Sequence, residues 1–294
     1  MAVSVRGGAC ARLAAGGAQP SQTHCRAALA RLPAPGAQLQ LRSVRPFESA
    51  GARRRSIIAA AWGDPVEWKP CKVVRSERAA QDLTSITLDV GERSSGYTTA
   101  GQFLQLKVGD SKPAFIAVAS PPRPSSEIDL LIKSQGGTSD LLCALQAGEE
   151  ADGSAIMGKG FPVGAVSAED APTVLLFATG SGISPIKALI ESGQLSGRKA
   201  RLYYGARCAD SMAFQDLFDA WRSAGVEVTP VFSNPADGWA GATGYVQDAV
   251  KADLGAIDGA STVVVLCGQK EMVEGVKEVL TPAGVPEDRF LLNF

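Results

Sequence analysis

Four glycine-containing segments in the last third of the chain have the residue types and spacing to do chemistry. Each falls where a strand pattern gives way to a helix or a loop, and they span residues 177–185, 203–207, 239–246 and 266–269. Glycine lets the backbone approach a ligand closely, and free N–H groups at a helix start favour an anion such as a pyrophosphate. Open α/β sheets bind ligands where their strands end. Together the segments predict a nicotinamide-nucleotide site.

The first segment has the clearest role. Thr179, Gly180, Ser181 and Gly182 stand between an apolar run and a helical pattern, so their backbone N–H groups are candidates to bind a pyrophosphate. Taken alone, such a turn is equally consistent with a tight strand-to-helix connection. The three other segments at successive strand ends favour nucleotide binding.

Strand and helix patterns alternate from residue 171 to residue 294. We expect strands at 173–179, 200–204, 226–232, 262–266 and 289–294, and helices at 184–191, 211–223, 246–254 and 272–280. This alternation predicts right-handed crossovers and a doubly wound parallel sheet covered on both faces.

Short β runs separated by turn residues fill the preceding part, from residue 65 to residue 168. Expected strands are 72–74, 83–88, 103–108, 115–119 and 128–132, with one helix after residues 136–139. Several runs alternate apolar and polar residues, which predicts an antiparallel β-barrel of Greek-key type or a sandwich.

Residues 1–60 have a different composition from the rest. They contain nine Arg, no Lys and one acidic residue, Glu48. Such a basic, acid-poor segment is typical of a transit peptide, disordered and cleaved near Ala60. We expect a chloroplast protein, in the stroma or associated with thylakoids; a mitochondrial address and a disordered cytosolic tail are the alternatives.

Composition excludes several classes of chemistry. Without residues 1–60 the chain has 20 basic and 29 acidic residues, a net charge near −9, which disfavours nucleic acid and anionic membranes. The single histidine, His24, lies in that segment, so imidazole catalysis and histidine-ligated metals are not expected. The remaining cysteines form no C-x-x-C pair, which excludes the usual zinc and iron–sulfur patterns. No apolar run reaches the ~18 residues of a membrane span.

The chain resembles the ferredoxin–NADP reductase superfamily over residues 65–294. In the second half, residues 179–185 resemble the pyrophosphate turn T-G-x-G-[IV]-[AST]-P, and residues 204–207 resemble the end of the family's second strand. Residues 267–272 resemble the C-G-P-x-x-M element, with Gln269 in place of Pro. Residues 284–289 resemble the G-V-P-x-x-R segment that precedes the chain end in the family. In the first half, residues 100–104, 136–139 and 157–161 are similar to P-G-Q-[FY]-[VL], G-x-x-[ST] and G-P-x-G-x-F.

This resemblance implies an FAD-binding barrel followed by an NAD(P)H-binding α/β domain. By the matching motif positions, Gly137, Thr138 and Ser139 would bind the flavin pyrophosphate, and Cys267 and Gly268 would adjoin the nicotinamide, with Cys267 as the catalytic residue that aligns the hydride. The chain-terminal aromatic, Phe294, would lie near the flavin. Without the motif around it, Cys267 is expected to be a small buried residue at the end of a strand.

The family's R-x-[YF]-[ST] signature is replaced in this chain. It aligns with Ala114, Phe115, Ile116 and Ala117, so the arginine, the ring and the hydroxyl are absent. Phe115 would supply the ring only if the strand register shifted by one residue, which exchanges its faces. Ala117 stands where the hydroxyl near the flavin would be, and Lys112 is the candidate for the missing charge.

The choice between NADH and NADPH stays open in the sequence. Residues 233–237, after the third strand, contain no cation to pair a 2′-phosphate, which favours NADH. A chloroplast setting favours NADPH, and Arg207 is the candidate to contact the phosphate.

We therefore predict hydride transfer from NAD(P)H to FAD and onward electron transfer to an unidentified acceptor, a quinone or a small redox protein. Two alternatives follow from the altered flavin signature: a nucleotide-binding redox sensor, or a structural subunit of an organellar complex.

Overall fold

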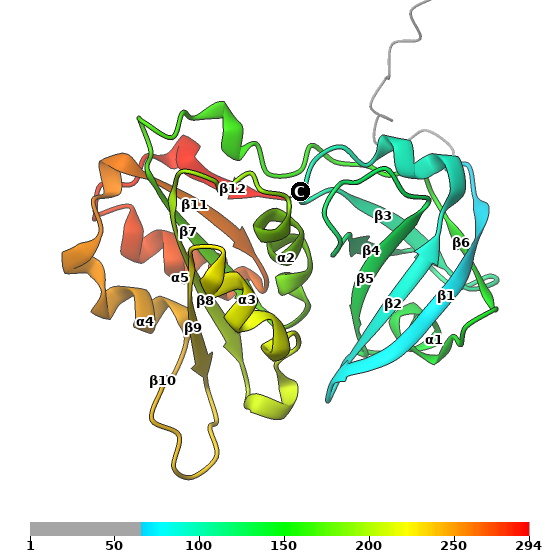
Figure 1. Cartoon of the computed structure of the whole chain (residues 1–294). Coiled ribbons are helices and arrows are strands. Elements are labelled where there is room, and N and C mark those ends of the chain that lie inside the picture. Colours follow the sequence, from blue (N-terminus) through cyan, green and yellow to red (C-terminus); the bar gives the residue numbers. More distant parts are fainter. Residues whose placement is uncertain (1–65, 294) are drawn as a thin grey trace, which may run out of the picture. The chain divides into compact units, whose positions relative to one another are not determined.

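The computed structural model describes residues 66–293. The expected transit peptide, its cleavage site near Ala60 and Phe294 lie outside the described residues. Within them an antiparallel sheet is followed by a parallel sheet with helices on both faces (Figure 1). This is the architecture that the alternation patterns predict.

The first domain is a barrel of antiparallel strands. Its strands are β1 (Lys69–Ala80), β2 (Leu83–Asp89), β3 (Phe103–Lys107), β4 (Ala114–Ala117), β5 (Glu127–Lys133) and β6 (Glu150–Gly153), in the order β4-β3-β6-β1-β2-β5. A bridge between Val118 and Leu130 joins the two edge strands of this order and closes the barrel. Strand β6 was not predicted, because only Ala151 in it is a buried hydrophobic residue.

The second domain is built on parallel strands in the order β10-β9-β8-β7-β11-β12. These strands are β7 (Thr173–Thr179), β8 (Lys199–Ala206), β9 (Val226–Phe232), β10 (Ala242–Thr243), β11 (Thr262–Cys267) and β12 (Phe290–Leu292). The order reverses between β8 and β11, on either side of β7. A reversal of this kind opens a crevice at the carboxyl ends of the strands.

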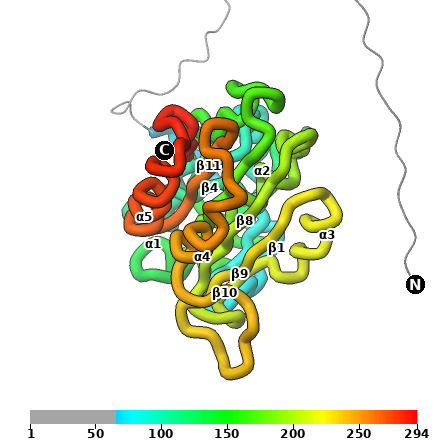
Figure 2. Tube along the Cα trace, turned by 90° about the vertical axis from the view of Figure 1, so that its left-hand side faces the viewer, coloured from blue at the N-terminus to red at the C-terminus, as the bar shows by residue number. Residues whose placement is uncertain are grey.

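Helices cover both faces of the parallel sheet. On one face α2 (Ile183–Glu191) and α3 (Phe218–Ser223) share a core cluster, and on the other α4 (Val246–Ala252) and α5 (Lys270–Leu280) share a second one. Figure 2 shows the two helix pairs on opposite sides of the strands. The doubly wound arrangement is confirmed.

The helix expected at residues 211–223 is wrong over its first half. Phe214 adopts a left-handed conformation with φ of 62°, which ends any helix there. The Gln215 side chain donates to the carbonyls of Ala209 and Met212, so these groups are paired without a helix. The α-helix α3 begins only at Phe218.

The barrel and the parallel sheet pack directly against each other. Leu83, Leu131 and Phe161 of the barrel belong to the same buried cluster as Ile183 and Ile186 of α2. The two domains therefore share a buried apolar contact beside α2.

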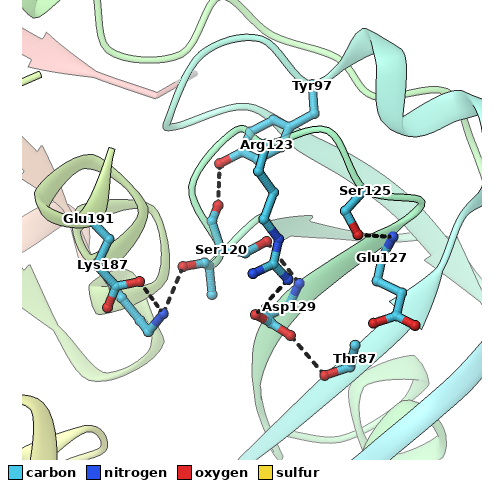
Figure 3. Close-up of polar contacts among 10 residues, drawn as sticks. Thr87, Tyr97, Ser120, Arg123, Ser125, Glu127, Asp129, Lys187 and Glu191 are labelled. Atoms are coloured by element: carbon cyan, nitrogen blue, oxygen red, sulfur yellow. Dashed lines mark hydrogen bonds and ion pairs between the residues drawn. The ribbon is translucent and has the colours of Figure 1, made fainter. Parts of the chain in front are cut away.

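A polar contact reinforces this packing (Figure 3). Lys187 of α2 donates to the Ala119 carbonyl of the barrel at 3.4 Å and pairs with Glu191 at 2.7 Å. The loop that carries Ala119 is held from its own side, because the Tyr97 hydroxyl donates to the Ser120 carbonyl and the Asp129 N–H donates to Ser120 Oγ.

Candidate functional site

A cleft of about 1280 Å³ lies between the barrel and the carboxyl ends of the parallel strands. One wall comes from β4, β5 and the start of α1 (Thr138–Ala144), and the other from the turns after β7, β8, β9 and β11. Ten of the predicted site residues line this cleft: Phe115, Ala117, Ser139, Thr179, Gly180, Ser181, Gly182, Arg207, Cys267 and Gly268. Gly137 and Thr138 do not.

The turn after β7 forms the floor of the nucleotide side. Gly180 adopts φ of 54°, and residues Gly180–Gly182 make a single 3-10 turn that runs into α2. A β-carbon at Gly182 would overlap the carbonyl of Cys267, so only glycine fits there. Helix α2 therefore begins at the cleft, where a helix start favours an anion. The first N–H of α2, that of Ile183, already donates to the carbonyls of Gly180 and Ser181, so an anion would meet the N–H groups of the turn itself.

The turn after β11 is joined to the turn after β7. The Gln269 N–H donates to Thr179 Oγ1 at 3.2 Å, and a β-carbon at Gly268 would overlap the same oxygen. Strands β7 and β11 are neighbours, with Ala178 opposite Cys267. The two motifs thus form one continuous glycine-rich surface.

Cys267 is buried at the end of β11 and lines the cleft. Burial raises the pKa of its thiol to about 12, because the apolar surroundings disfavour the thiolate. At neutral pH the group is therefore a thiol and a poor nucleophile. What it offers a ligand is a small, polarisable surface.

The turn after β8 carries the cation of the nucleotide side. Arg207 is exposed, and its carbonyl accepts from the Asn234 N–H at 2.8 Å, which places it beside the end of β9. Arg207 and Lys133 are the two cations among the described residues of the cleft lining. The Tyr204 hydroxyl donates to the Gly180 carbonyl and accepts from the Ala213 N–H, so β8 also supports the first turn.

On the barrel side, Phe115 presents its ring to the cleft. Pairing of β3 with β4 places Ile116 opposite Leu104 and Phe115 opposite Gln105. Ala114 and Ile116 pack against the barrel core, whereas Phe115 is 50% exposed and meets the edge of the Phe103 ring. Phe115 and Ile116 both line the cleft, and the aromatic ring is carried by the neighbour of the aligned signature position.

The start of α1 offers fewer groups to a flavin pyrophosphate than the G-x-x-[ST] motif predicts. Thr138 is buried and its hydroxyl donates to the Lys112 carbonyl, while Lys112 itself is exposed and does not line the cleft. The Asp140 carboxylate accepts from the Ser134 hydroxyl and the Gly136 N–H, which lowers the pKa of Asp140. Helix α1 has seven residues, so it adds little field for an anion.

These residues fit the ring system of a flavin. Phe115 offers an aromatic face, Ser139 and Lys133 offer donors, and Leu131 adds apolar surface from β5. Family members use an arginine to pair the flavin pyrophosphate. Among the described residues that line the barrel side of the cleft, Lys133 is the one cation that could take this role.

Two amides in the lining were not predicted. Gln247 is the second residue of α4 and Asn293 follows β12, and both have side-chain atoms that are buried without a hydrogen-bond partner. Their only signal in the sequence is a polar residue within an apolar pattern. Among the described residues there is no group of three or more potential metal ligands, and no helix is long and apolar enough to cross a membrane.

Known proteins resemble this chain in sequence. Residues 176–278 match the oxidoreductase NAD-binding domain. The chain is 34% identical over 247 residues to the fruit protein pKIWI502 of Actinidia deliciosa, covering 78% of each. It is 28% identical to terephthalate 1,2-dioxygenase reductase component 2 of Comamonas sp, over 73% of this chain and 64% of that protein's length.

A solved structure shares the fold. It is a ferredoxin NADP⁺ reductase of Neisseria gonorrhoeae with bound FAD and NADP, with a TM-score of 0.63 at 19% identity, covering 75% of this chain and 93% of that one. The chain belongs to the ferredoxin–NADP reductase-like superfamily. It is an oxidoreductase of the class that uses FAD and NAD(P)H.

Proposed function

We propose that this protein takes hydride from a nicotinamide nucleotide onto FAD and passes the electrons to a separate acceptor, a quinone or a small redox protein. One observation carries the proposal: Phe115 of the barrel and Cys267 of the parallel sheet line the same cleft. Bound FAD supplies the chemistry, because a flavin accepts two electrons as hydride and releases them singly.

The chain's own residues bind and orient. Thr179, Gly180, Ser181 and Gly182 hold the nucleotide pyrophosphate by backbone N–H groups, and the Cys267 thiol packs beside the reacting end of the nucleotide. Phe115 stacks on the flavin, and Lys133 with Ser139 bind its polar parts. No protein acid or base is required, which agrees with the absence of histidine from residues 66–293.

We propose NADH as the preferred nucleotide. The end of β9 presents Ser233 and Asn234 to the cleft, and the nearest lining cation is Arg207. A 2′-phosphate held by a single exposed arginine gains little, because solvent screens such a contact. NADH needs no cation at this position.

We propose that the acceptor is a separate redox partner. Support comes from a relative named as the reductase component of a dioxygenase, a protein that by its name works within a multicomponent system. The acidic balance of residues 61–294 favours a partner with a basic or neutral docking face over a strongly acidic one.

We propose a plastid location on the composition of residues 1–60. A fluorescent protein fused after residue 61 should enter chloroplasts, and the same fusion with Arg53, Arg54 and Arg55 changed to Glu should not. Import into mitochondria instead would overturn this assignment.

A redox sensor without turnover is the second candidate. The observation in its favour is that Ala114 and Ile116, which pack against the barrel core, occupy the positions of the arginine and the aromatic ring of the family signature. Such a protein would bind NADH and not reduce a flavin.

The absorption spectrum of the purified full chain separates these candidates. Flavin bands near ~450 nm that bleach anaerobically with NADH, and more slowly with NADPH, support the reductase. A colourless protein that takes up no FAD yet binds NADH supports the sensor. A protein that binds neither would overturn both.

A further inference from the structure

Asn293 carries a buried carboxamide that has no partner. The residue is 2% exposed, yet neither Oδ1 nor Nδ2 forms a hydrogen bond. Buried polar groups in native proteins are nearly always paired, because an unpaired amide loses its hydration without compensation. Asn293 lines the cleft, so the missing partner is available only from what the cleft binds.

The position of Asn293 defines which part of a ligand it meets. Strand β12 pairs with β11, with Leu292 opposite Leu266, so Asn293 stands beside Cys267 at the carboxyl edge of the sheet. Cys267 in turn contacts Gly182 of the first turn. A nucleotide whose pyrophosphate lies at the turn after β7 and which extends across β11 arrives at Asn293.

The unpaired carboxamide of Asn293 determines which hydrogen-bonding groups its ligand must carry. Nδ2 requires an acceptor and Oδ1 requires a donor, and the two requirements are side by side in one plane. A primary carboxamide meets both, because its C=O and NH₂ are arranged in the same way. Two amides that face each other form a closed pair of hydrogen bonds.

We propose that Asn293 binds the carboxamide of the nicotinamide, with Nδ2 donating to the carboxamide oxygen and Oδ1 accepting from its N–H. The contact fixes the rotation of the nicotinamide ring beside Cys267. This inference rests on the proposed function, since it requires the nucleotide to lie in the cleft.

Equilibrium binding of dinucleotide analogues to the full, FAD-loaded chain tests the contact. 3-Acetylpyridine adenine dinucleotide keeps the carbonyl and replaces the NH₂ by a methyl group, and ADP-ribose lacks the ring. Loss of one buried hydrogen bond corresponds to roughly tenfold in affinity. We expect wild type to bind NAD⁺ about tenfold more tightly than the acetyl analogue.

Asn293→Leu should remove this discrimination. NAD⁺ and the acetyl analogue should then bind within about twofold of each other, and ADP-ribose should bind as in wild type, because only the carboxamide contact is lost. Gln247→Leu is the matched control, since it removes the other buried, unpartnered amide atom of the lining and should preserve the discrimination.

Thermal unfolding of the nucleotide-free protein provides a readout independent of binding. Asn293→Leu should raise the Tm, because an apolar side chain removes the cost of burying an unpaired amide. Asn293→Ala serves if leucine prevents folding; it should abolish the discrimination in the same way.

The outcomes separate this inference from the proposed function. Undiminished discrimination in Asn293→Leu overturns the carboxamide contact. Altered FAD affinity with unchanged discrimination also overturns it and assigns Asn293 to the donor–acceptor edge of the flavin. A wild-type protein that binds neither NAD⁺ nor ADP-ribose overturns the proposed function itself.

Discussion

Gly182 lies so close to Cys267 that any side chain at position 182 would overlap the carbonyl oxygen of Cys267. The two residues come from turns that are far apart in the sequence and adjacent in the sheet, because β7 and β11 are paired. Their contact sets the spacing between the pyrophosphate turn and the residue beside the nicotinamide.

Gly182→Ala should therefore damage both stability and binding. Over-packing of this kind costs about 2 kcal/mol, and for a chain of this size that corresponds to a Tm lower by roughly 4–8 °C. Nucleotide affinity should fall because the turn must move. Gly255→Ala is the control, since a β-carbon there meets nothing within 4 Å. Equal Tm values for the two variants would contradict the contact.

The Cys267 thiol should be chemically silent at neutral pH. Its pKa is raised from 9.0 to about 12, so NADH oxidation should show no titration of this group between pH 6 and 9, and iodoacetamide should not modify it in the folded protein. Rapid alkylation at pH 8 would contradict the burial.

The same shift predicts a dependence of stability on pH. The unfolded chain ionises the thiol near pH 9 and the folded chain at about 12, so the stabilisation is complete below pH 9 and is lost as the pH rises toward 12. The difference in unfolding free energy between wild type and Cys267→Ala should shrink by about 1.4 kcal/mol per pH unit in this range. A constant difference from pH 8 to 11 would disagree.

Phe115 should support flavin binding by its ring. Phe115→Leu should weaken FAD binding about tenfold, a loss within the range of aromatic stacking, and Phe115→Tyr should stay within about twofold. Titration of the flavin-free protein with FAD, followed by quenching of flavin fluorescence, measures both. If leucine and tyrosine behave alike, the ring has no stacking role.

Arg207 should act on NADPH and not on NADH. Arg207→Ala removes the one cation near the end of β9 in the described cleft lining, so NADPH affinity should fall by no more than about threefold, the range of an exposed ion pair, while NADH affinity stays unchanged. Competition binding with both nucleotides checks this. A parallel loss for both would place Arg207 at the pyrophosphate.

Lys187 should contribute more to stability than a surface lysine. Its side chain is 12% exposed and its partner Glu191 is 27% exposed, whereas Lys270 and Glu274 form an equally spaced pair that is mostly solvated. Lys187→Met should lower the unfolding free energy by about 1–2 kcal/mol, because Glu191 and the Ala119 carbonyl lose a partner. Lys270→Met should cost less than about 0.5 kcal/mol. Similar Tm values for the two variants would contradict the interdomain contact.

Much of the fold could be predicted because its signals are local. A period of two residues in the first half and alternating strand and helix patterns in the second are properties of short segments, and so is the need for glycine at Gly180. The glycine-rich turns therefore mark the nucleotide wall of the cleft without any knowledge of the tertiary structure. The break in the helical pattern at Phe214 is harder to predict from sequence, because it depends on hydrogen bonds from the Gln215 side chain to the backbone.

Long-range pairing decided the rest of the site. Phe115 is on the exposed face of β4 because β4 pairs with β3 in the register that packs Ile116 against the barrel core, and a shift of one residue would exchange the two faces. Asn293 stands beside Cys267 only because β12 pairs with β11. The residues themselves determined which chemistry was available, and the pairing of strands distant in sequence determined which side chains share one cleft.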